Sequence, residues 1–200
     1  MNNKISSTAI LEAASVLHTG GVIVFPTETT YGLGCDPRCK DAVERVFRIK
    51  ERDHTKPLLL VAGSWEQVEQ VAVLSAQAQG IAERYWPGPL TLILPLRSEA
   101  GLVDGVALNN EVSIRFSSSE IAQALTNQFG FPIVATSANL AGQPDSRSMD
   151  DVNAYNLGVD YIIDGGTLPV SKPSTVARIK ESGEVTVIRD GVIRIITNSL

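Results

Sequence analysis

Short apolar runs that alternate with helical patterns constrain the fold of this chain more than any other feature. The runs that predict buried strands in the first two thirds are residues 22–25, 58–61, 91–96, 112–116 and 133–135. Apolar spacing and serine start signals predict helices over 8–18, 64–72, 75–85 and 119–129. They also predict one helix that ends near Lys50 and a short one after Ser148. This alternation favours a sheet with helices packed on it.

The C-terminal third has a different pattern, in which strands follow one another. The predicted strands are 161–163, 174–179, 185–188 and 192–196, separated by the turn sequences DGG, ESG and DG. No stretch between the two patterns has the composition of a linker. We therefore predict an α/β (α+β) fold in one domain over residues 1–200, with a mixed, twisted sheet and flanking helices.

The composition is that of an ordinary globular protein, because 44% of the 200 residues are hydrophobic and 20% are charged. The formal net charge of -5 argues against a surface that wraps broadly around nucleic acid, since such domains usually carry a basic footprint. The sequence has no apolar run of about 18 residues, and its N-terminus has no secretion signal. We expect a cytoplasmic protein without membrane contact.

Cysteine and histidine are too scarce for a typical zinc site. Cys35 and Cys39 are the only cysteines, and only His18 and His54 could complete a ligand set. We expect no metal site built by the protein, and free thiols rather than a disulfide in a reducing compartment.

Three polar loops each follow a predicted strand or helix. They are PTETTYGLG (26–34), IKERDHTKPL (49–58) and ATSANLAG (135–142). Sites of α/β proteins commonly lie where strands end in loops, so these loops form the candidate site. Arg115 is a further candidate, because it places one cation in an otherwise apolar strand. Glu28 could orient a substrate amine, hold a metal or cap backbone donors, and the structural role is favoured.

The loops lack the two common phosphate-binding fingerprints, the P-loop and the G-x-G-x-x-G turn. Lys50, Arg52 and Lys56 could neutralise a triphosphate, or they could form a solvated basic turn at a helix end. Ser137 and Asn139 could bind phosphate or ribose, or they could bond their own backbone in a turn. The individual loops therefore leave both a ligand site and plain turns open.

Taken together and in order, the segments resemble the YrdC/Sua5/TsaC family of L-threonylcarbamoyladenylate synthases. The segments that carry the resemblance are PTETTYGLGCDP, KER, KPLLL, WPGPLTLIL, SIR, TSANLAGQP, PSTV and VIRDG. The similarity spans about residues 8–195. It implies a mixed α/β, YrdC-like domain around a large, concave, basic cavity, in the short form without the additional C-terminal domain of longer relatives.

The resemblance also implies an enzyme, a nucleotidyltransferase that makes threonylcarbamoyl-AMP and pyrophosphate from ATP, L-threonine and bicarbonate. Mg2+ would arrive bound to the ATP. The product would pass to the tRNA threonylcarbamoyl-transferase proteins for modification of adenosine 37 of tRNA. A direct contact between this protein and RNA stays open.

The family's functional residues transfer to numbered positions of this chain. Lys50 and Arg52 would be catalytic, by stabilising charge on the phosphates. The residues expected to bind ATP are Lys50, Arg52, Lys56, Ser137, Asn139 and Arg189. The residues expected to bind threonine are Thr27, Thr29, Tyr31, Arg115 and Ser174, with Arg115 on the carboxylate. Gly32 and Gly34 would let the backbone approach the ligand.

We expect Lys50 and Arg52 to be partly exposed, so that alanine at either position would cut turnover by orders of magnitude without unfolding the protein. The charged loop 51–56 is the candidate for a lid. Val61 stands where some longer relatives have histidine, and Asp145-Ser146 where many have serine. No ligand role is assigned to Asp145 or Ser146.

Other functions on the same fold remain alternatives. An RNA-binding module could use the same basic cavity, although the net acidity of the chain speaks against it. A synthase-inactive paralogue would be expected to lose the K-x-R or S-x-N motif, and both are intact here. A carbamoyl-transferring domain of the hydrogenase-maturation proteins would normally be part of a longer chain.

Overall fold

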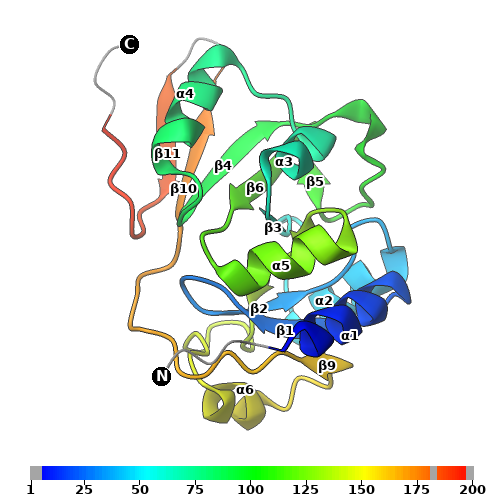
Figure 1. The fold of residues 1–200 in the computed structure, drawn as a ribbon. Helices are drawn as coiled ribbons and strands as arrows, with labels where there is room; N and C mark the ends of the chain where they lie inside the picture. The colour runs from blue at the N-terminus through cyan, green and yellow to red at the C-terminus, as the bar shows by residue number, and fades with distance from the viewer. Residues whose placement is uncertain (1–5, 181–183, 197–200) are drawn as a thin grey trace.

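Two β-sheets form the centre of the molecule in the computed structural model, which describes residues 6–180 and 184–196 (Figure 1). The strands are β1 (Ile23–Pro26), β2 (Tyr31–Gly34), β3 (Leu60–Ala62), β4 (Leu90–Pro95), β5 (Ala107–Leu108), β6 (Glu111–Phe116), β7 (Ile133–Val134), β8 (Thr136–Ser137), β9 (Tyr161–Ile162), β10 (Thr175–Ile179) and β11 (Val185–Arg189). The smaller sheet has the order β8-β2-β1-β9, and the larger has β11-β10-β4-β6-β3-β7, with β5 paired to β6.

Both sheets are mixed, because β1–β9, β4–β10 and β3–β6 are parallel while the other pairs are antiparallel. The predicted mixed α/β fold is confirmed. The strands are divided between two sheets, however, where the sequence led us to expect one.

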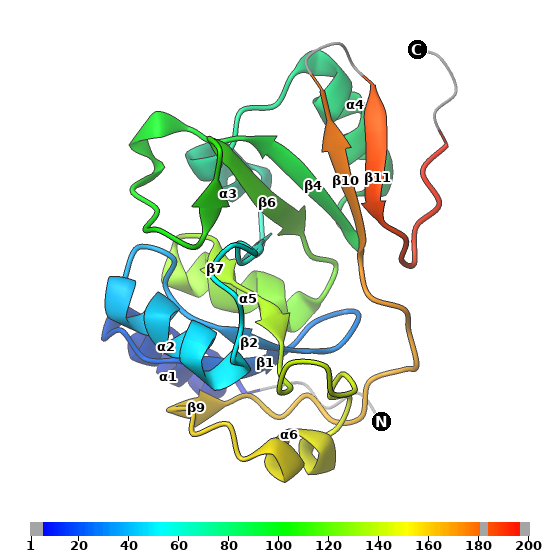
Figure 2. The same cartoon turned by 180° about the vertical axis from the view of Figure 1, so that it is seen from behind.

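Helices cover the outer faces of the sheets (Figures 1 and 2). They are α1 (Ser7–His18), α2 (Lys40–Lys50), α3 (Trp65–Val71), α4 (Ala76–Tyr85), α5 (Glu120–Phe129) and α6 (Met149–Tyr155), with a 3-10 turn at Ser98–Ala100. Helices α3 and α4 pack on the larger sheet, against β6 and β4. Helix α5 contacts β3 of the larger sheet and β1 of the smaller one, so it joins the two sheets.

Serine residues begin most of these helices, as the sequence predicts. Ser64, Ser75, Ser119 and Ser148 each accept a hydrogen bond from the backbone N–H of the third residue that follows. At Ser148 the bond is reciprocal, because the Asp151 carboxylate accepts from the Ser148 N–H. The start points of these helices are therefore determined locally.

The first polar loop contains a strand that we did not expect. Tyr31–Gly34 (β2) pairs antiparallel with β1, with Ile23 opposite Gly34. A Cβ atom at Gly34 would lie 2.7 Å from Phe25 Cε1 and 2.7 Å from the carbonyl oxygen of Val134. Glycine is thus required here by packing between neighbouring strands, and not by a ligand as predicted. Glycine is rare in strand interiors, which is why the sequence pattern indicated a loop.

The segment 133–137 crosses from one sheet to the other. Strand β7 pairs with β3 in the larger sheet, and β8 pairs with β2 in the smaller one. The N–H of Val134 donates to the Cys35 carbonyl, and the N–H of Ala135 donates to the Leu59 carbonyl. Thr136 and Ser137, which we expected in a loop, therefore form a strand. This crossing brings the third polar loop next to the first.

Residues 192–196, expected as a strand, do not form one. The N–H of Val192 donates to the Pro173 carbonyl, that of Ile193 to the Thr175 Oγ1, and that of Ile196 to the Tyr85 hydroxyl. Two of these three acceptors are side-chain oxygens rather than a neighbouring strand's carbonyls. Alternation of apolar residues does not show whether backbone N–H groups bond to a neighbouring strand or to side chains. The predicted strand over 192–196 was therefore wrong.

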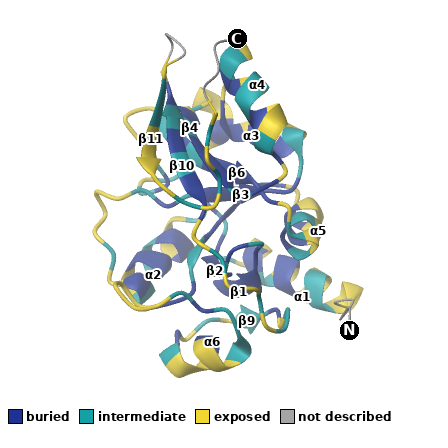
Figure 3. Cartoon of the chain, turned by 90° about the vertical axis from the view of Figure 1, so that its left-hand side faces the viewer, coloured by how far each residue is buried: buried dark blue, intermediate teal, exposed yellow. Residues whose placement is uncertain are grey.

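The hydrophobic core lies on the central strands and the inner faces of the helices, with exposed residues at the periphery (Figure 3). Phe25, Phe47 and Tyr31 are among the largest side chains that are fully buried. Within residues 6–180 and 184–196, no helix is long and apolar enough to cross a bilayer.

Candidate functional site

A cavity of about 350 Å3 lies where the two sheets meet, within the size range of small-molecule sites. Its walls come from the turn between β1 and β2, the loop after α2, strands β4, β6, β10 and β11, and the crossing segment. The lining includes Thr27, Thr29, Thr30, Gly32, Arg52, Thr91, Ser113, Arg115, Ser137, Asp145, Ser174, Ile188 and Arg189.

Arg52 reaches the cavity from the loop that follows α2. Its Nε donates to the Lys56 carbonyl at 2.9 Å, and its Nη2 donates to the Pro57 carbonyl at 3.1 Å. Both acceptors are neutral, so the guanidinium is oriented without being neutralised. Burial lowers the pKa of Arg52, which means that its charge is poorly solvated. An anion in the cavity would offset the unfavourable free energy of desolvating this charge.

Arg189 enters the cavity from β11 beside a β-bulge. The register shifts between Val176 and Ala177, and Ile188 and Arg189 both line the cavity. The Arg189 Nη2 donates to the Ser174 carbonyl at 2.8 Å and to the Ser174 Oγ at 2.9 Å. Burial lowers the pKa of Arg189, and the charge of Arg115 lowers it further.

Arg115 projects from the middle of β6 and is only 4% exposed. Its Nη1 lies 3.3 Å from the Glu28 Oε1 and donates to the Thr29 Oγ1 at 3.3 Å. Burial lowers the pKa of Arg115, and the Glu28 carboxylate opposes that shift. Arg115 and Glu28 thus form a buried ion pair between β6 and the hairpin turn.

The turn between β1 and β2 presents a row of hydroxyl groups. The Thr27 Oγ1 donates to the Thr30 carbonyl at 2.7 Å and accepts from the Thr29 N–H at 3.2 Å. The Thr30 hydroxyl donates to the Ser146 carbonyl, which ties the turn to the third polar loop. These bonds hold Thr27 and Thr29 at the cavity wall, where each can still contact a ligand.

Lys50 does not reach the cavity lining, and it is 4% exposed, so the expectation of partial exposure was wrong for this residue. Its ammonium donates to the Ser137 carbonyl at 2.7 Å, to the Asn139 carbonyl at 2.8 Å and to the Asn139 Oδ1. Burial, and secondly the charge of Arg52, lower the pKa of Lys50 to about 8. Lys50 therefore fastens the S-x-N loop to the end of α2.

The other predicted ligand residues are divided between the cavity and its support. Ser137 lies on the lining, whereas Asn139 is buried behind it and donates to the Gln143 carbonyl. Lys56 is exposed and outside the lining. The side chain of Tyr31 is fully buried, where its hydroxyl donates to the Gly166 carbonyl at 2.7 Å. Tyr31 thus anchors the segment that leads to Ser174.

Several lining residues were given no ligand role in the sequence analysis. Asp145 is the carboxylate on the lining, and the Asn139 Nδ2 donates to its Oδ1 at 3.3 Å. The Thr91 Oγ1 lies 2.9 Å from the Ser174 Oγ, which in turn contacts Arg189. Strand periodicity could have indicated that Thr91 shares a face with Ile93, but Asp145 carries no local signal beyond its place after the S-x-N loop.

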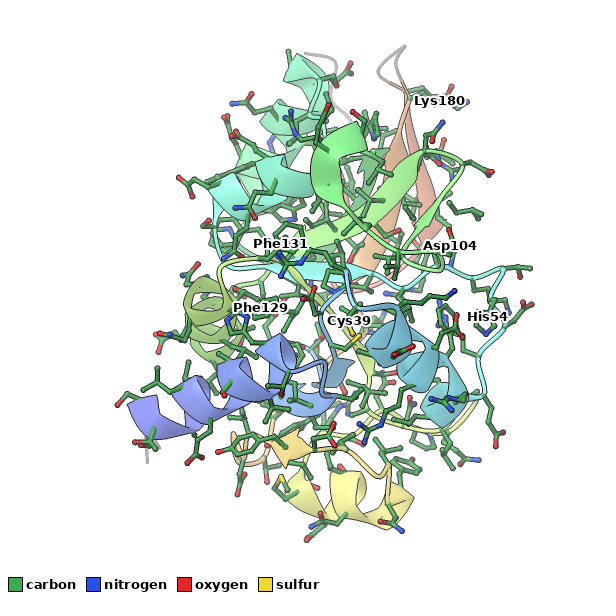
Figure 4. The ribbon with its side chains drawn as sticks, turned by 90° about the vertical axis from the view of Figure 1, so that its right-hand side faces the viewer. Cys39, His54, Asp104, Phe129, Phe131 and Lys180 are labelled. Atoms are coloured by element: carbon green, nitrogen blue, oxygen red, sulfur yellow. The ribbon has the colours of Figure 1, made fainter. Side chains whose placement is uncertain are left out.

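Neither cysteine lies on the cavity lining in the described structure. Cys35 is buried, and burial raises the pKa of its thiol. Cys39 lies beside the start of α2, and His54 lies on the loop after α2, where its ring stacks on Phe47 at 4.2 Å (Figure 4). Within the described ranges, no three His, Cys, Asp or Glu side chains gather in a metal-binding cluster.

The arrangement is suited to binding anions together with a polar small molecule. Three guanidinium groups converge on one cavity, and Arg189 lies within electrostatic range of the other two, since Arg115 and Arg52 both lower the pKa of Arg189. Hydroxyl groups of Thr27, Thr29 and Ser137 complete the walls. Guanidinium groups bind carboxylates and phosphates in the same bidentate way, so geometry alone allows either anion.

Comparison with known proteins identifies the family. Residues 15–191 match the Sua5/YciO/YrdC family model, whose description reads "Telomere recombination". The chain belongs to the Sua5/YciO/YrdC family. A threonylcarbamoyl-AMP synthase of Hahella chejuensis is 40% identical over 174 residues, which covers 86% of this chain and 94% of that protein. A threonylcarbamoyl-AMP synthase of Klebsiella pneumoniae is 35% identical over 185 residues, covering 88% and 94%.

Solved structures of Sua5/YciO/YrdC proteins have the same fold. Sua5 of P. abyssi in complex with L-threonine matches with a TM-score of 0.84 and 34% identity, over 94% of this chain. This chain spans only 56% of that Sua5 chain. YciO of E. coli matches with a TM-score of 0.84 and 29% identity, covering 94% of this chain and 91% of that one.

Proposed function

We propose that this protein is a threonylcarbamoyl-AMP synthase, a nucleotidyltransferase that uses ATP, L-threonine and bicarbonate. The names of its relatives support this reaction, and so does the L-threonine bound to a Sua5 that matches over 94% of this chain. The observation that carries the proposal is the cavity itself. It combines Arg115 and two threonine hydroxyls with Arg52 and Arg189, so that an amino acid and a triphosphate could bind side by side.

The reaction requires positioning more than covalent chemistry. The threonine amine and bicarbonate condense to a carbamate with loss of water. A carbamate oxygen then forms a bond to the α-phosphorus of ATP, while the bond to the bridging oxygen breaks and pyrophosphate leaves with the electron pair. Holding both substrates at reacting distance removes much of the entropic barrier. Guanidinium groups stabilise the charge that develops on the phosphate oxygens.

The residues of the cavity wall and those that support it have different parts in this proposal. Arg52 and Arg189 would bind the phosphates, and Ser137 would donate a hydrogen bond beside them. Lys50 and Asn139 would act from behind by holding the Ser137 loop, and Lys56 would add positive charge near the entrance. Arg115 would bind the threonine carboxylate, with the hydroxyls of Thr27 and Thr29 next to it. Ser174 would orient Arg189 and border the amino acid.

The residues present fit a Mg2+ ion that arrives on the phosphates of ATP. Asp145 supplies a carboxylate oxygen on the lining, and Mg2+ commonly binds one or two carboxylates together with phosphate oxygens. When bound, the ion would neutralise charge on the leaving pyrophosphate. We further propose that the product is passed to cytoplasmic proteins that transfer its threonylcarbamoyl group to tRNA.

The experiment that tests this function is a pyrophosphate-release assay with the purified protein, ATP, Mg2+, L-threonine and bicarbonate. Leaving out each component in turn should abolish release, and mass spectrometry should detect an adenylate with the mass of threonylcarbamoyl-AMP. Folded protein that binds ATP but releases no pyrophosphate would contradict the proposal. That outcome would favour an inactive paralogue.

A further inference from the structure

Glu28 has no part in the function proposed above, yet it pairs with one of the cavity's cations. Its Oε1 lies 3.3 Å from the Nη1 of Arg115, and the two side chains are 12% and 5% exposed. Because the pair is almost sealed from water, the attraction between the two charges is screened far less than at a surface. The Glu28 charge therefore has a strong effect on the potential at Arg115.

The other two arginines of the cavity have neutral partners. Arg52 donates to the backbone carbonyls of residues 56 and 57, and Arg189 donates to the carbonyl and hydroxyl of Ser174. Asp145 also lies on the lining, but in the described part of the chain it forms no ion pair with either arginine. Arg115 is thus the one cavity arginine, within those residues, that has its own countercharge.

The position of the Glu28 carboxylate is fixed. Ser117, which is fully buried, donates from its Oγ to the Glu28 Oε2 and accepts from the Ser119 N–H at 3.1 Å. Two atoms of the pair can nevertheless form further hydrogen bonds, because the Glu28 Oε1 and the Arg115 Nε are buried without a hydrogen-bond partner in the described structure. Buried polar atoms without a partner are rare in folded proteins, so the incomplete bonding of this pair calls for an explanation, and a role beside a ligand-binding residue supplies one.

A fixed negative charge at Arg115 affects the two kinds of substrate differently. A phosphate group would add up to two negative charges next to Glu28, and the repulsion would offset its attraction to Arg115. A zwitterionic amino acid places a carboxylate on Arg115 but also carries an ammonium group. It therefore brings no net negative charge next to Glu28. At Arg52 and Arg189 no ion-paired carboxylate opposes phosphate within the described residues, although the charge of Asp145 also acts on Arg189.

We propose that Glu28 is a specificity-determining residue that excludes phosphate from Arg115 and thereby reserves this end of the cavity for the amino acid. This inference rests on the proposed function, in which one cavity must sort a carboxylate from a triphosphate. Glu28 acts through Arg115, so it is a positioning residue and does not itself need to touch the substrate. Without it, the three arginines would form a continuous anion site.

Isothermal titration calorimetry of L-threonine, with and without inorganic phosphate, tests this inference. In the unmodified protein, phosphate should bind without weakening threonine binding. In Glu28→Gln, phosphate should compete at Arg115 and raise the apparent threonine dissociation constant about 10-fold, since the loss of one partly buried countercharge corresponds to roughly one decade in affinity. Glu69→Gln is the matched control, because it removes the same charge from an exposed position on α3.

Ser117→Ala separates charge from geometry. This variant removes the bond to the Glu28 Oε2 but leaves the carboxylate, so phosphate should still fail to compete with threonine. A purely structural role for Glu28 would instead make Ser117→Ala and Glu28→Gln behave alike. Circular dichroism would verify the fold of each variant.

The outcomes that overturn the inference are distinct from failure of the proposed function. Competition between phosphate and threonine in the unmodified protein would overturn it, even if Glu28→Gln did not fold. A folded Glu28→Gln in which phosphate still does not compete would also overturn it, while leaving the synthase function intact. Unmodified protein that binds no threonine and makes no adenylate would refute the proposed function, and this inference with it.

Discussion

At the scale of single residues, Lys50 shows how burial changes what a charged side chain can do. A lysine at a helix end next to a basic loop would ordinarily be solvated, and the family resemblance suggested a direct contact with phosphate. In the structure, the ammonium uses its three hydrogens on acceptors of Ser137 and Asn139. Its contribution to binding ATP would then be the position of the Ser137 loop.

This arrangement predicts a pH limit on activity. Above the Lys50 pKa of about 8, the neutral amine keeps two hydrogens and turns a lone pair towards an oxygen acceptor. The loop should loosen, so kcat/KM for ATP should fall as the pH rises through about 8. Measuring this pH profile checks the prediction, with Lys50→Arg as the comparison. Because a guanidinium does not titrate in this range, kcat/KM of that variant should not fall as the pH rises through about 8.

Protein stability should move in the opposite direction over the same pH range. The pKa of Lys50 is lower in the folded protein than its ordinary value of 10.5, so the unfolded chain binds more protons between about 8 and 10.5. The contribution of Lys50 to stability is therefore complete above 10.5 and is lost as the pH falls through about 8. Urea unfolding at pH 7 and 9 would distinguish loss of activity from loss of fold. A pH profile identical in Lys50→Arg would exclude Lys50 as its cause.

At the scale of elements, the hairpin β1–β2 illustrates why glycine positions were misread. Glycine in PTETTYGLG indicated a flexible loop, yet Gly32 and Gly34 both lie in a strand. Phe25 lies opposite Gly32 across the hairpin, and its ring occupies the space that a side chain at Gly34 would need, whereas a methyl group at Gly32 would lie in ordinary contact with it. The hairpin therefore depends on the close packing of an aromatic ring against Gly34.

Alanine substitutions at the two glycines should have different effects. Gly34→Ala should lower the free energy of unfolding by about 1–3 kcal/mol, because its methyl group would overlap the Phe25 ring and a backbone oxygen. At Gly32 the nearest atoms to a methyl group are 3.4 Å away, which is ordinary contact. Gly32→Ala should therefore change stability by less than about 0.5 kcal/mol. Urea unfolding of both variants measures the difference.

Gly32→Ala also separates stability from binding, since Gly32 lines the cavity. Its methyl group should weaken ligand binding while the fold is retained. Equal loss of stability in the two variants would contradict the packing described here.

At the scale of the whole molecule, the cavity is walled by both sheets, and α5 and the segment 133–137 connect them. A ligand in the cavity would therefore contact both sheets at once. The same connection explains why the charges at positions 52 and 115 influence Arg189, although the three residues lie in distant parts of the sequence. Binding and global stability should then be coupled.

This coupling predicts one unfolding transition that shifts as a unit. ATP at about 100 times its dissociation constant should add about 2.7 kcal/mol to the free energy of unfolding. For a chain of this size, that corresponds to a rise in Tm of about 5–10 °C. Differential scanning calorimetry with ATP, and with adenosine as the control without phosphates, would measure it. Two transitions, of which only one responds to ATP, would show that the sheets unfold independently.

The sequence by itself determined the local features of this protein. Serine caps predicted the starts of α3 and α5, and apolar runs predicted β1, β4 and β6, because these signals depend on residues a few positions apart. The ordered motifs also indicated the family and several of the cavity residues, including Arg52, Arg115 and Arg189. These predictions need no knowledge of which strand lies next to which.

Tertiary structure decided everything that depends on contacts between distant segments. It divided the strands between two sheets, turned residues 136–137 into β8 and left 192–196 outside any sheet, because backbone groups pair with whatever acceptor the fold brings near. It also buried Lys50, placed Asp145 on the cavity and set Glu28 beside Arg115. The charge environment of a side chain depends on neighbours that lie far away in the sequence, as the 86 positions between Thr29 and Arg115 illustrate.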